Sequence, residues 1–221
     1  MHISLSPGKV KMGSIPSVSL PSVITCRSCD CQTKCYAKKL ERLRPNVRAA
    51  YQRNIDILNN DPVQYWREVE AAIMCSRFFR FHVSGDIPND AYLEKMFEVA
   101  KRNPHCHILC FTKKFELVND YIYKLYWDSI AGTTIHPAFG CEEIIAERFV
   151  PNNLRLIFSG WRGLTMFNPF RFPEAHVRYR DGTTTARDGA IDCPGNCADC
   201  AITDSGCWTL KPGEQVIFNE H

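Results

Sequence analysis

The sequence predicts an α/β protein in which successive strands run parallel and form a sheet or a partial (β/α) barrel. Two observations lead to this prediction. Short apolar runs alternate with segments of helical periodicity, and the order strand, helix, strand, helix, strand implies right-handed crossovers. With 221 residues, of which 45% are hydrophobic, the chain is long enough for one substantial core. We therefore expect a single α/β domain over residues 1–221.

The first half of the chain supplies one early strand and a run of helices. "PSVSLP" (16–21) is the first strand candidate, and helical sequence follows from Tyr36 to about Asn59. Helical sequence is expected again from Val63 to Cys75, and Pro62 interrupts the stretch between the two segments.

The middle of the chain carries the clearest strands. "FFRFHV" (78–83), "HCHILCF" (105–111) and "LRLIF" (154–158) are short apolar runs typical of strands, the last of a buried one. Helical spacing of apolar residues lies between the first two and recurs after the second, and Asp90 can cap the start of the first of these helices. Residues 128–151 look like an insertion with a short helix, "EEIIAERF". "AHVRYR" (175–180) and "QVIFN" (215–219) are further strand candidates.

The composition favours a cytoplasmic protein with reduced thiols. The N-terminus "MHISLSPGKVKMG" has no apolar run after its charges, and no segment approaches the length of a membrane span. A formal charge of +3 does not by itself argue for nucleic acid. Segment 34–53, however, carries seven Lys and Arg against one Glu, and it indicates either a solvated helix face or a nucleic-acid-binding surface.

Two groups of cysteines flank the α/β body. The first group is "TCRSCDCQTKC", with Cys26, Cys29, Cys31 and Cys35 inside ten residues of a loop, 26–35. Thiolates this crowded repel one another unless a metal ion, an iron–sulfur cluster or disulfides separate them. Residues two apart tend to point to opposite faces, so Cys29 and Cys31 are not expected to reach one cluster together. One of the four is then spare, and three ligands would leave one iron open to a small molecule.

The second group lies in the C-terminal segment 193–207, "CPGNCADCAITDSGC". Its cysteines are Cys193, Cys197, Cys200 and Cys207, with three, two and six residues between them. Each group contains one Cys-x2-Cys pair, as a zinc knuckle would. A zinc site built from these pairs would leave four cysteines unexplained, whereas iron–sulfur clusters accept irregular spacings. We therefore expect a cluster rather than zinc at the C-terminal group.

The other cysteines receive no chemical role. Cys75, Cys106 and Cys110 fall in apolar helix or strand context, where a free cysteine commonly behaves as a small buried hydrophobe. Cys141 lies in the insertion and stays unassigned.

A glycine turn with a carboxylate follows the second strand, in "FHVSGDIP". Ser84, Gly85 and Asp86 would lie at the C-terminal edge of the sheet, where α/β folds place ligands. Glycine lets the backbone approach a ligand, and the acid can accept hydrogen bonds from an ammonium group. The alternative is a loop in which Asp86 only satisfies backbone donors. His82 is expected to be a satisfied structural histidine.

Polar residues also follow the next two strands. Thr112, Lys113 and Lys114 could meet a carboxylate or phosphate at the same edge, or be solvated there. Ser159 and Trp161 end the following strand in a similar way.

This arrangement resembles radical S-adenosylmethionine (SAM) enzymes. In those enzymes a partial α/β barrel carries a three-cysteine cluster loop after its first strand and a Gly-Gly-Glu-like motif after its second, which "VSGDIP" resembles. The usual Cys-x3-Cys-x2-Cys order is absent from the N-terminal loop. Cys193, Cys197 and Cys200 have that spacing but follow another strand.

A closer resemblance is to the gene-product-88 family of phage and prophage proteins. It is carried by "SLPSVITC", "CQTKCYAKK", "FRFHVSGDI", "LCFTKKFELVN", "PNNLRLIFSGW" and "CPGNCADCAITDSGCW", over nearly the full length. The resemblance implies an iron–sulfur protein with a radical-SAM-like body and indicates little about its substrate. It favours Cys26, Cys31 and Cys35 as ligands, with Cys29 spare.

The first functional hypothesis is thus a radical-SAM-like enzyme. Its N-terminal 4Fe-4S cluster would bind and reductively cleave SAM, and a C-terminal cluster would serve electron transfer or structure. An electron donor such as flavodoxin or ferredoxin is then the expected partner. The rival hypothesis is a non-catalytic, metal-stabilised module, with zinc or iron–sulfur, that binds nucleic acid through segment 34–53 or serves as an interaction module.

Overall fold

The computed structural model describes residues 2–6, 12–26, 31, 34–131 and 141–220. The helices are α1 (Ser22–Thr25), α2 (Tyr36–Leu43), α3 (Pro45–Asn60), α4 (Pro62–Met74), α5 (Asp90–Arg102), α6 (Phe115–Ser129), α7 (Glu142–Phe149), α8 (Cys197–Ile202) and the 3-10 turn η2 (Gly206–Trp208). The strands are β1 (Leu5–Ser6), β2 (Ser17–Val18), β3 (Phe78–Phe81), β4 (His107–Thr112), β5 (Leu154–Ser159), β6 (Glu174–Arg178), β7 (Ile191–Asp192) and β8 (Gln215–Asn219).

The described strands form one mostly parallel sheet of eight strands in the order β1-β2-β3-β4-β5-β6-β8-β7. Only β1 and β2 pair antiparallel. Strands β2 to β6 are neighbours in chain order, and each pairs in parallel with the next. The predicted α/β class and parallel order are therefore confirmed, and over the described residues the sheet is not closed.

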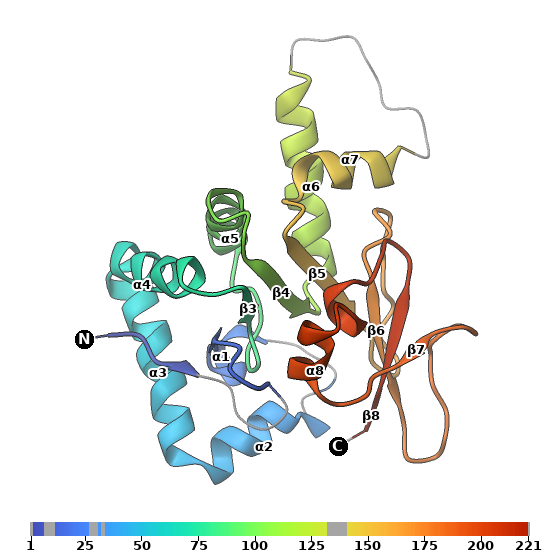
Figure 1. Cartoon of the computed structure of the whole chain (residues 1–221), viewed down its shortest axis with the longest axis horizontal. Coiled ribbons are helices and arrows are strands. Elements are labelled where there is room, and N and C mark those ends of the chain that lie inside the picture. Colours follow the sequence, from blue (N-terminus) through green and yellow to red (C-terminus); the bar gives the residue numbers. More distant parts are fainter. Residues whose placement is uncertain (1, 7–11, 27–30, 32–33, 132–140, 221) are drawn as a thin grey trace.

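The predicted helical sequence over 36–59 is confirmed, and it forms two helices, α2 and α3. Arg44 leaves the helical region (φ −128°, ψ 85°) between α2 and α3. Pro45 causes the break, since a proline ring disfavours helical backbone in the residue before it. The break lets α3 pack against α4, while α2 contacts α1 and α3 (Figure 1).

Different elements pack on the two faces of the sheet. On β4, Ile108 and Cys110 pack with the helices α3 to α7, whereas Leu109 and Phe111 pack with the C-terminal segment. This follows from the alternation of side chains along a strand. Figure 1 shows α4 and α5 on one side of β3 and β4 and α8 on the other. The C-terminal cysteine segment thus forms part of a core, with Trp208 buried in it.

The expected insertion contains the predicted short helix, α7, which packs beside α6 (Figure 1). Residues 132–140 of the insertion lie outside the described residues. None of the helices in the described ranges is both long and apolar enough to span a membrane.

Candidate functional site

The Ser84-Gly85-Asp86 turn is held tightly against the segment after β2. Gly85 has φ +84°, and a Cβ placed there would lie 2.6 Å from the carbonyl oxygen of Leu20. Only glycine tolerates both the positive φ and this approach. The Ser84 carbonyl accepts a hydrogen bond from the Leu20 amide at 3.1 Å. The turn therefore locks the end of β3 to the end of β2.

Asp86 ties this turn to the end of β4. Its carboxylate is buried, and Oδ1 accepts hydrogen bonds from Thr112 Oγ1 at 2.6 Å and the Ile87 amide at 2.8 Å. Oδ2 accepts from the Lys113 amide at 2.9 Å. Burial raises the pKa of this carboxyl, although the hydrogen bonds oppose the rise. Asp86 therefore does satisfy backbone donors, and three of the about four acceptor positions of a carboxylate are occupied.

Cys26 lies next to the same turn. Thr25 Oγ1 accepts a hydrogen bond from the Asp86 amide at 3.0 Å and lies 4.0 Å from Cys26 Sγ. The loop after β2, the turn after β3 and Thr112 at the end of β4 meet here, because parallel neighbours end at the same edge of the sheet.

Cys35 and Cys31 form the other half of the N-terminal group. Cys35 is the N-cap of α2, and its sulfur accepts hydrogen bonds from the Cys31 side chain and from the Lys38 and Ala37 amides. These bonds, with that from Cys31 the largest effect, lower the pKa of Cys35 to about 6 despite partial burial. The charges of Cys26 and Cys35 both act on the hydroxyl of Tyr36. Cys29 lies outside the described residues.

Glu41 is a residue that sequence reasoning missed. It is buried on α2, and its Oε1 accepts from Ser84 Oγ at 2.7 Å and from the Ser22 amide at 3.0 Å. Glu41 thus fastens α2, and with it Cys35, to the Ser84 turn. The signal in the sequence was that Glu41 is the single acid of the basic segment 34–53.

The C-terminal cysteines come from the end of β7, from α8 and from η2. Burial raises the pKa of Cys207 to about 12, and the charges of the other three cysteine sulfurs add to the rise. The sulfur of Cys193 accepts a hydrogen bond from the Gly195 amide at 3.4 Å. The predicted grouping of Cys193, Cys197, Cys200 and Cys207 thus corresponds to mutual electrostatic influence in the structure.

The described residues contain no set of three or more His, Cys, Asp or Glu side chains arranged to hold a metal ion. The N-terminal group is represented by Cys26, Cys31 and Cys35.

Arg80 lies between the sheet and the C-terminal cysteines, and sequence reasoning did not single it out. Its Nη1 lies 3.5 Å from Met12 Sδ and 4.0 Å from Cys197 Sγ, and its guanidinium lies 4.9 Å from the Phe111 ring centre. Its Nε is buried without a hydrogen-bond partner among the described atoms. The signal was a charged residue in the middle of the apolar strand "FFRFHV".

His82 is buried, and the expectation of a satisfied histidine is wrong among the described residues. Neither ring nitrogen has a hydrogen-bond partner in the described part of the chain. Burial, with a contribution from Arg80, lowers its pKa to about 3, so the ring is neutral. Its φ of 58° is left-handed, which is rare for a residue with a side chain.

The remaining predicted residues have mixed outcomes. Thr112 joins the site through Asp86, and its Oγ1 also accepts from the Lys114 amide at 2.9 Å. Lys113 contacts Asp86 through its backbone. Ser159 ends β5, and Trp161 packs edge-on against Tyr179, without contact to Asp86.

The expectation for the unassigned cysteines is partly wrong. Cys106 and Cys110 are buried as small hydrophobes, but Cys75 is exposed because it caps the C-terminus of α4 beyond the packed face. Cys141 is partly exposed at the start of α7.

The fold and the site define an α/β protein with a parallel sheet, a cysteine-bearing loop at the C-terminal edge of that sheet, and a cysteine-rich segment on one face. The family model of gene product 88 matches residues 4–162, and the chain belongs to this family. The match ends before the C-terminal cysteine segment, so it is shorter than the resemblance that the sequence suggests. No curated protein and no solved structure matches the chain.

Proposed function

We propose that the chain is an iron–sulfur protein of radical-SAM-like type that binds and reductively cleaves SAM. Cys26, Cys31 and Cys35 would hold the N-terminal 4Fe-4S cluster. The second cluster would be held by Cys193, Cys197, Cys200 and Cys207. The observation that carries the proposal is the meeting of the Cys26 loop and the Asp86 turn at the ends of adjacent parallel strands.

The N-terminal group has features that suit a cluster with three protein ligands. Cys31 and Cys35 are in hydrogen-bond contact, and backbone amides of α2 donate to Cys35. Amide donors to cysteine sulfur stabilise the negative charge of an iron–sulfur centre. Three cysteine ligands would leave one iron of such a cluster without a protein ligand, as the site that would take SAM.

Asp86 is suited to hold an ammonium group beside this open position. Among the described residues Oδ2 accepts one hydrogen bond, from the Lys113 amide, so it retains acceptor capacity. The fixed Thr112 and amide donors orient the carboxylate. Because the carboxyl is buried, its bond to an ammonium group would be strong once SAM is bound.

The C-terminal group fits an anionic centre. Arg80 is partly buried, forms no ion pair with a carboxylate of the described residues, and has an orphan Nε. A buried guanidinium is costly unless a negative group lies close to it. Its charge acts on Cys193 and Cys207, and its Nη1 lies 4.0 Å from Cys197 Sγ. As ligands of a cluster, these sulfurs would carry the negative charge that Arg80 lacks.

The proposed radical-SAM-like body would have a strand order of the kind found in this sheet. Parallel neighbours β2, β3, β4, β5, β6 and β8 follow chain order, as successive strands of a partial (β/α) barrel do. When bound, the reduced cluster would supply the electron that cleaves the carbon–sulfur bond of SAM. The role of the chain would be to bind SAM, orient its amino group and exclude water. A flavodoxin or ferredoxin would be the electron donor.

The test is anaerobic reconstitution with iron and sulfide, followed by electron paramagnetic resonance of the reduced protein with and without SAM. We expect about two four-iron clusters per chain and a SAM-dependent change in one signal. Replacing Cys26, Cys31 or Cys35 by serine should remove about half of the iron together with the SAM response. The C-terminal replacements should remove iron but leave the SAM response.

Two matched controls sharpen this test. Cys75→Ser changes an exposed cysteine outside both groups and should retain all iron. Cys29→Ala should be tolerated. Stoichiometric zinc with no affinity for iron and sulfide would contradict the cluster proposal. Two clusters without a SAM effect would reject the radical-SAM step alone, and a SAM effect lost only with the C-terminal cysteines would reverse the two roles.

A further inference from the structure

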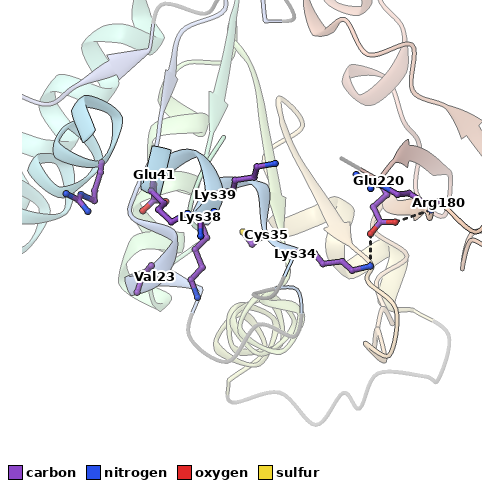
Figure 2. A pocket seen from close by; sticks show the side chains of 10 residues that line it. Val23, Lys34, Cys35, Lys38, Lys39, Glu41, Arg180 and Glu220 are labelled. Carbon is purple, nitrogen blue, oxygen red and sulfur yellow. Dashed lines mark hydrogen bonds and ion pairs between the residues drawn. The ribbon is translucent and has the colours of Figure 1, made fainter. Parts of the chain in front are cut away.

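A basic cleft lies between α2 and the C-terminal strand region, with a volume of about 750 Å³. Its lining residues are Val23, Lys34, Cys35, Lys38, Lys39, Glu41, Arg42, Arg48, Arg180 and Glu220. Figure 2 shows Cys35 between the lysines of α2 on one side and the Lys34–Glu220 ion pair on the other. The cleft is therefore bounded by residues that are far apart in the sequence.

Glu41 and Glu220, the two acids of the cleft, do not form ion pairs with the lysines and arginines of α2 and α3 that line it. Glu41 is buried and is engaged by Ser84 and Ser22. Glu220 binds Lys34 Nζ at 3.0 Å and the Arg180 amide at 3.0 Å. Both carboxylates thus already have partners inside the protein.

Four exposed cations of the cleft have no carboxylate partner among the described residues. They are Lys38, Lys39, Arg42 and Arg48, the first three on α2 and the last on α3. Lys38 and Arg42 are four residues apart, so they lie on one helix face about 6 Å apart along the axis. Uncompensated like charges repel one another, and a bound polyanion relieves the repulsion.

We propose that this cleft binds the phosphodiester backbone of a single-stranded nucleic acid. A row of several cations matches successive phosphates better than one small anion. The volume of the cleft is in the range of small-ligand pockets, so it suits a short stretch of flexible strand better than a stiff duplex. The cations act on phosphate, so binding is independent of base sequence.

This inference goes beyond the proposed function and does not depend on it, because the cations bind phosphate whether or not the thiols hold iron. Cys35 lines the same cleft, so a bound strand would pass beside the N-terminal cysteine group. The basic segment 34–53 therefore contributes its cations to a defined cleft of the fold.

The test is fluorescence anisotropy of labelled single-stranded DNA and RNA oligonucleotides with the anaerobically purified full chain at several salt concentrations. The test variant carries Lys38→Gln, Lys39→Gln and Arg42→Gln. The matched control carries Lys101→Gln, Lys124→Gln and Lys211→Gln, which change the net charge equally at exposed positions outside the cleft. ATP, duplex DNA and polyglutamate serve as competitors.

We expect salt-dependent binding by the wild type and an affinity at least about tenfold lower in the test variant. The slope of log affinity against log salt should fall by about 2, because each single-strand phosphate contact contributes about 0.7. The control should bind within about twofold of wild type, since salt screens distant surface charges. The absence of salt-dependent binding in the wild type, or equal weakening in both variants, would overturn the proposal. Competition by ATP or polyglutamate that equals competition by the oligonucleotide would overturn it as well.

Discussion

Thr112 Oγ1 donates a hydrogen bond to Asp86 Oδ1 across 2.6 Å, and both side chains are buried. The bond joins the end of β4 to the turn after β3. Thr112 Oγ1 also accepts from the Lys114 amide, so one hydroxyl connects the buried carboxylate to the start of α6. The edge of the sheet that carries Cys26 is therefore braced by side chains as well as by strand pairing.

Thr112→Val should destabilise the fold by about 1.5–3 kcal/mol, because it removes a hydrogen bond to a buried charged group while keeping the side-chain volume. Thr112→Ser keeps the hydroxyl and should cost less. Urea unfolding of the two variants measures the difference. Equal losses of stability in both would show that the methyl packing, and not the bond to Asp86, matters at this position.

Gly85→Ala should be far more damaging than Gly163→Ala. The two glycines have similar positive φ values, +84° and +82°, so an added Cβ should strain the backbone by a similar amount at both positions. Only at Gly85 would the Cβ also meet backbone, 2.6 Å from the Leu20 oxygen, whereas Gly163 has nothing within 4 Å. We expect a further loss of about 2 kcal/mol or more at Gly85.

Thermal or urea unfolding of these two alanine variants checks the prediction. Gly163→Ala is the control for the φ effect alone. Similar stabilities of the two variants would mean that the β2 and β3 ends can separate, and that the turn does not lock them.

Glu174→Gln should reduce the loss of unfolding free energy that the protein undergoes at acid pH. Burial raises the pKa of Glu174, but hydrogen bonds from His176, Asn168 and Gln215 outweigh it and lower the pKa to about 2 from 4.5. A carboxyl with a depressed folded pKa contributes stability above its unfolded pKa, and this is lost as pH falls from about 4.5 to about 2. The contribution is at most about 3 kcal/mol.

Unfolding free energies at pH 6 and pH 3 measure this effect. Wild type should lose more stability between these values than Glu174→Gln, whose amide does not titrate. Parallel losses in both proteins would place the acid sensitivity elsewhere in the chain.

The strands were predictable from the sequence because each central strand is an apolar run bounded by polar loops. "QVIFN" coincides with β8, and the run 154–158 lies within β5. The short strands β1 and β7 have only two residues each, too few for a periodic pattern. The break at Arg44 was readable from Pro45, but helical spacing on both sides concealed it.

The candidate site was predictable only as far as local motifs reach. Neighbouring parallel strands end at the same edge of the sheet, and this rule places Asp86 near Cys26 and Thr112, as the structure does. The rule needs only the order of the strands along the chain. Glu41 and Arg80 act across 43 and 117 residues of sequence, on Ser84 and Cys197 respectively. Contacts of this range depend on packing, which no local pattern encodes.

The last prediction concerns the charge of Arg80 and depends on the proposed C-terminal cluster. Arg80→Met should lower the midpoint reduction potential of that cluster, because loss of a nearby positive charge disfavours the more negative, reduced state. The expected shift is about 60 mV or more, which is a tenfold change for a one-electron couple. Arg77→Met is the matched control, since Arg77 is exposed and its guanidinium lies over Phe78, 5.2 Å from the ring centre.

Both changes are made in a Cys26→Ser background, so that the C-terminal cluster is observed alone by electron paramagnetic resonance during a redox titration. Iron content distinguishes a failure of the cluster proposal from a failure of the role proposed for Arg80. If iron is absent from the background protein, the cluster proposal itself fails. If iron is retained but Arg80→Met and Arg77→Met have the same potential, the cluster stands and Arg80 does not act on it. A lower potential in Arg80→Met alone, with iron retained, is the result that the contact between Arg80 and Cys197 leads us to expect.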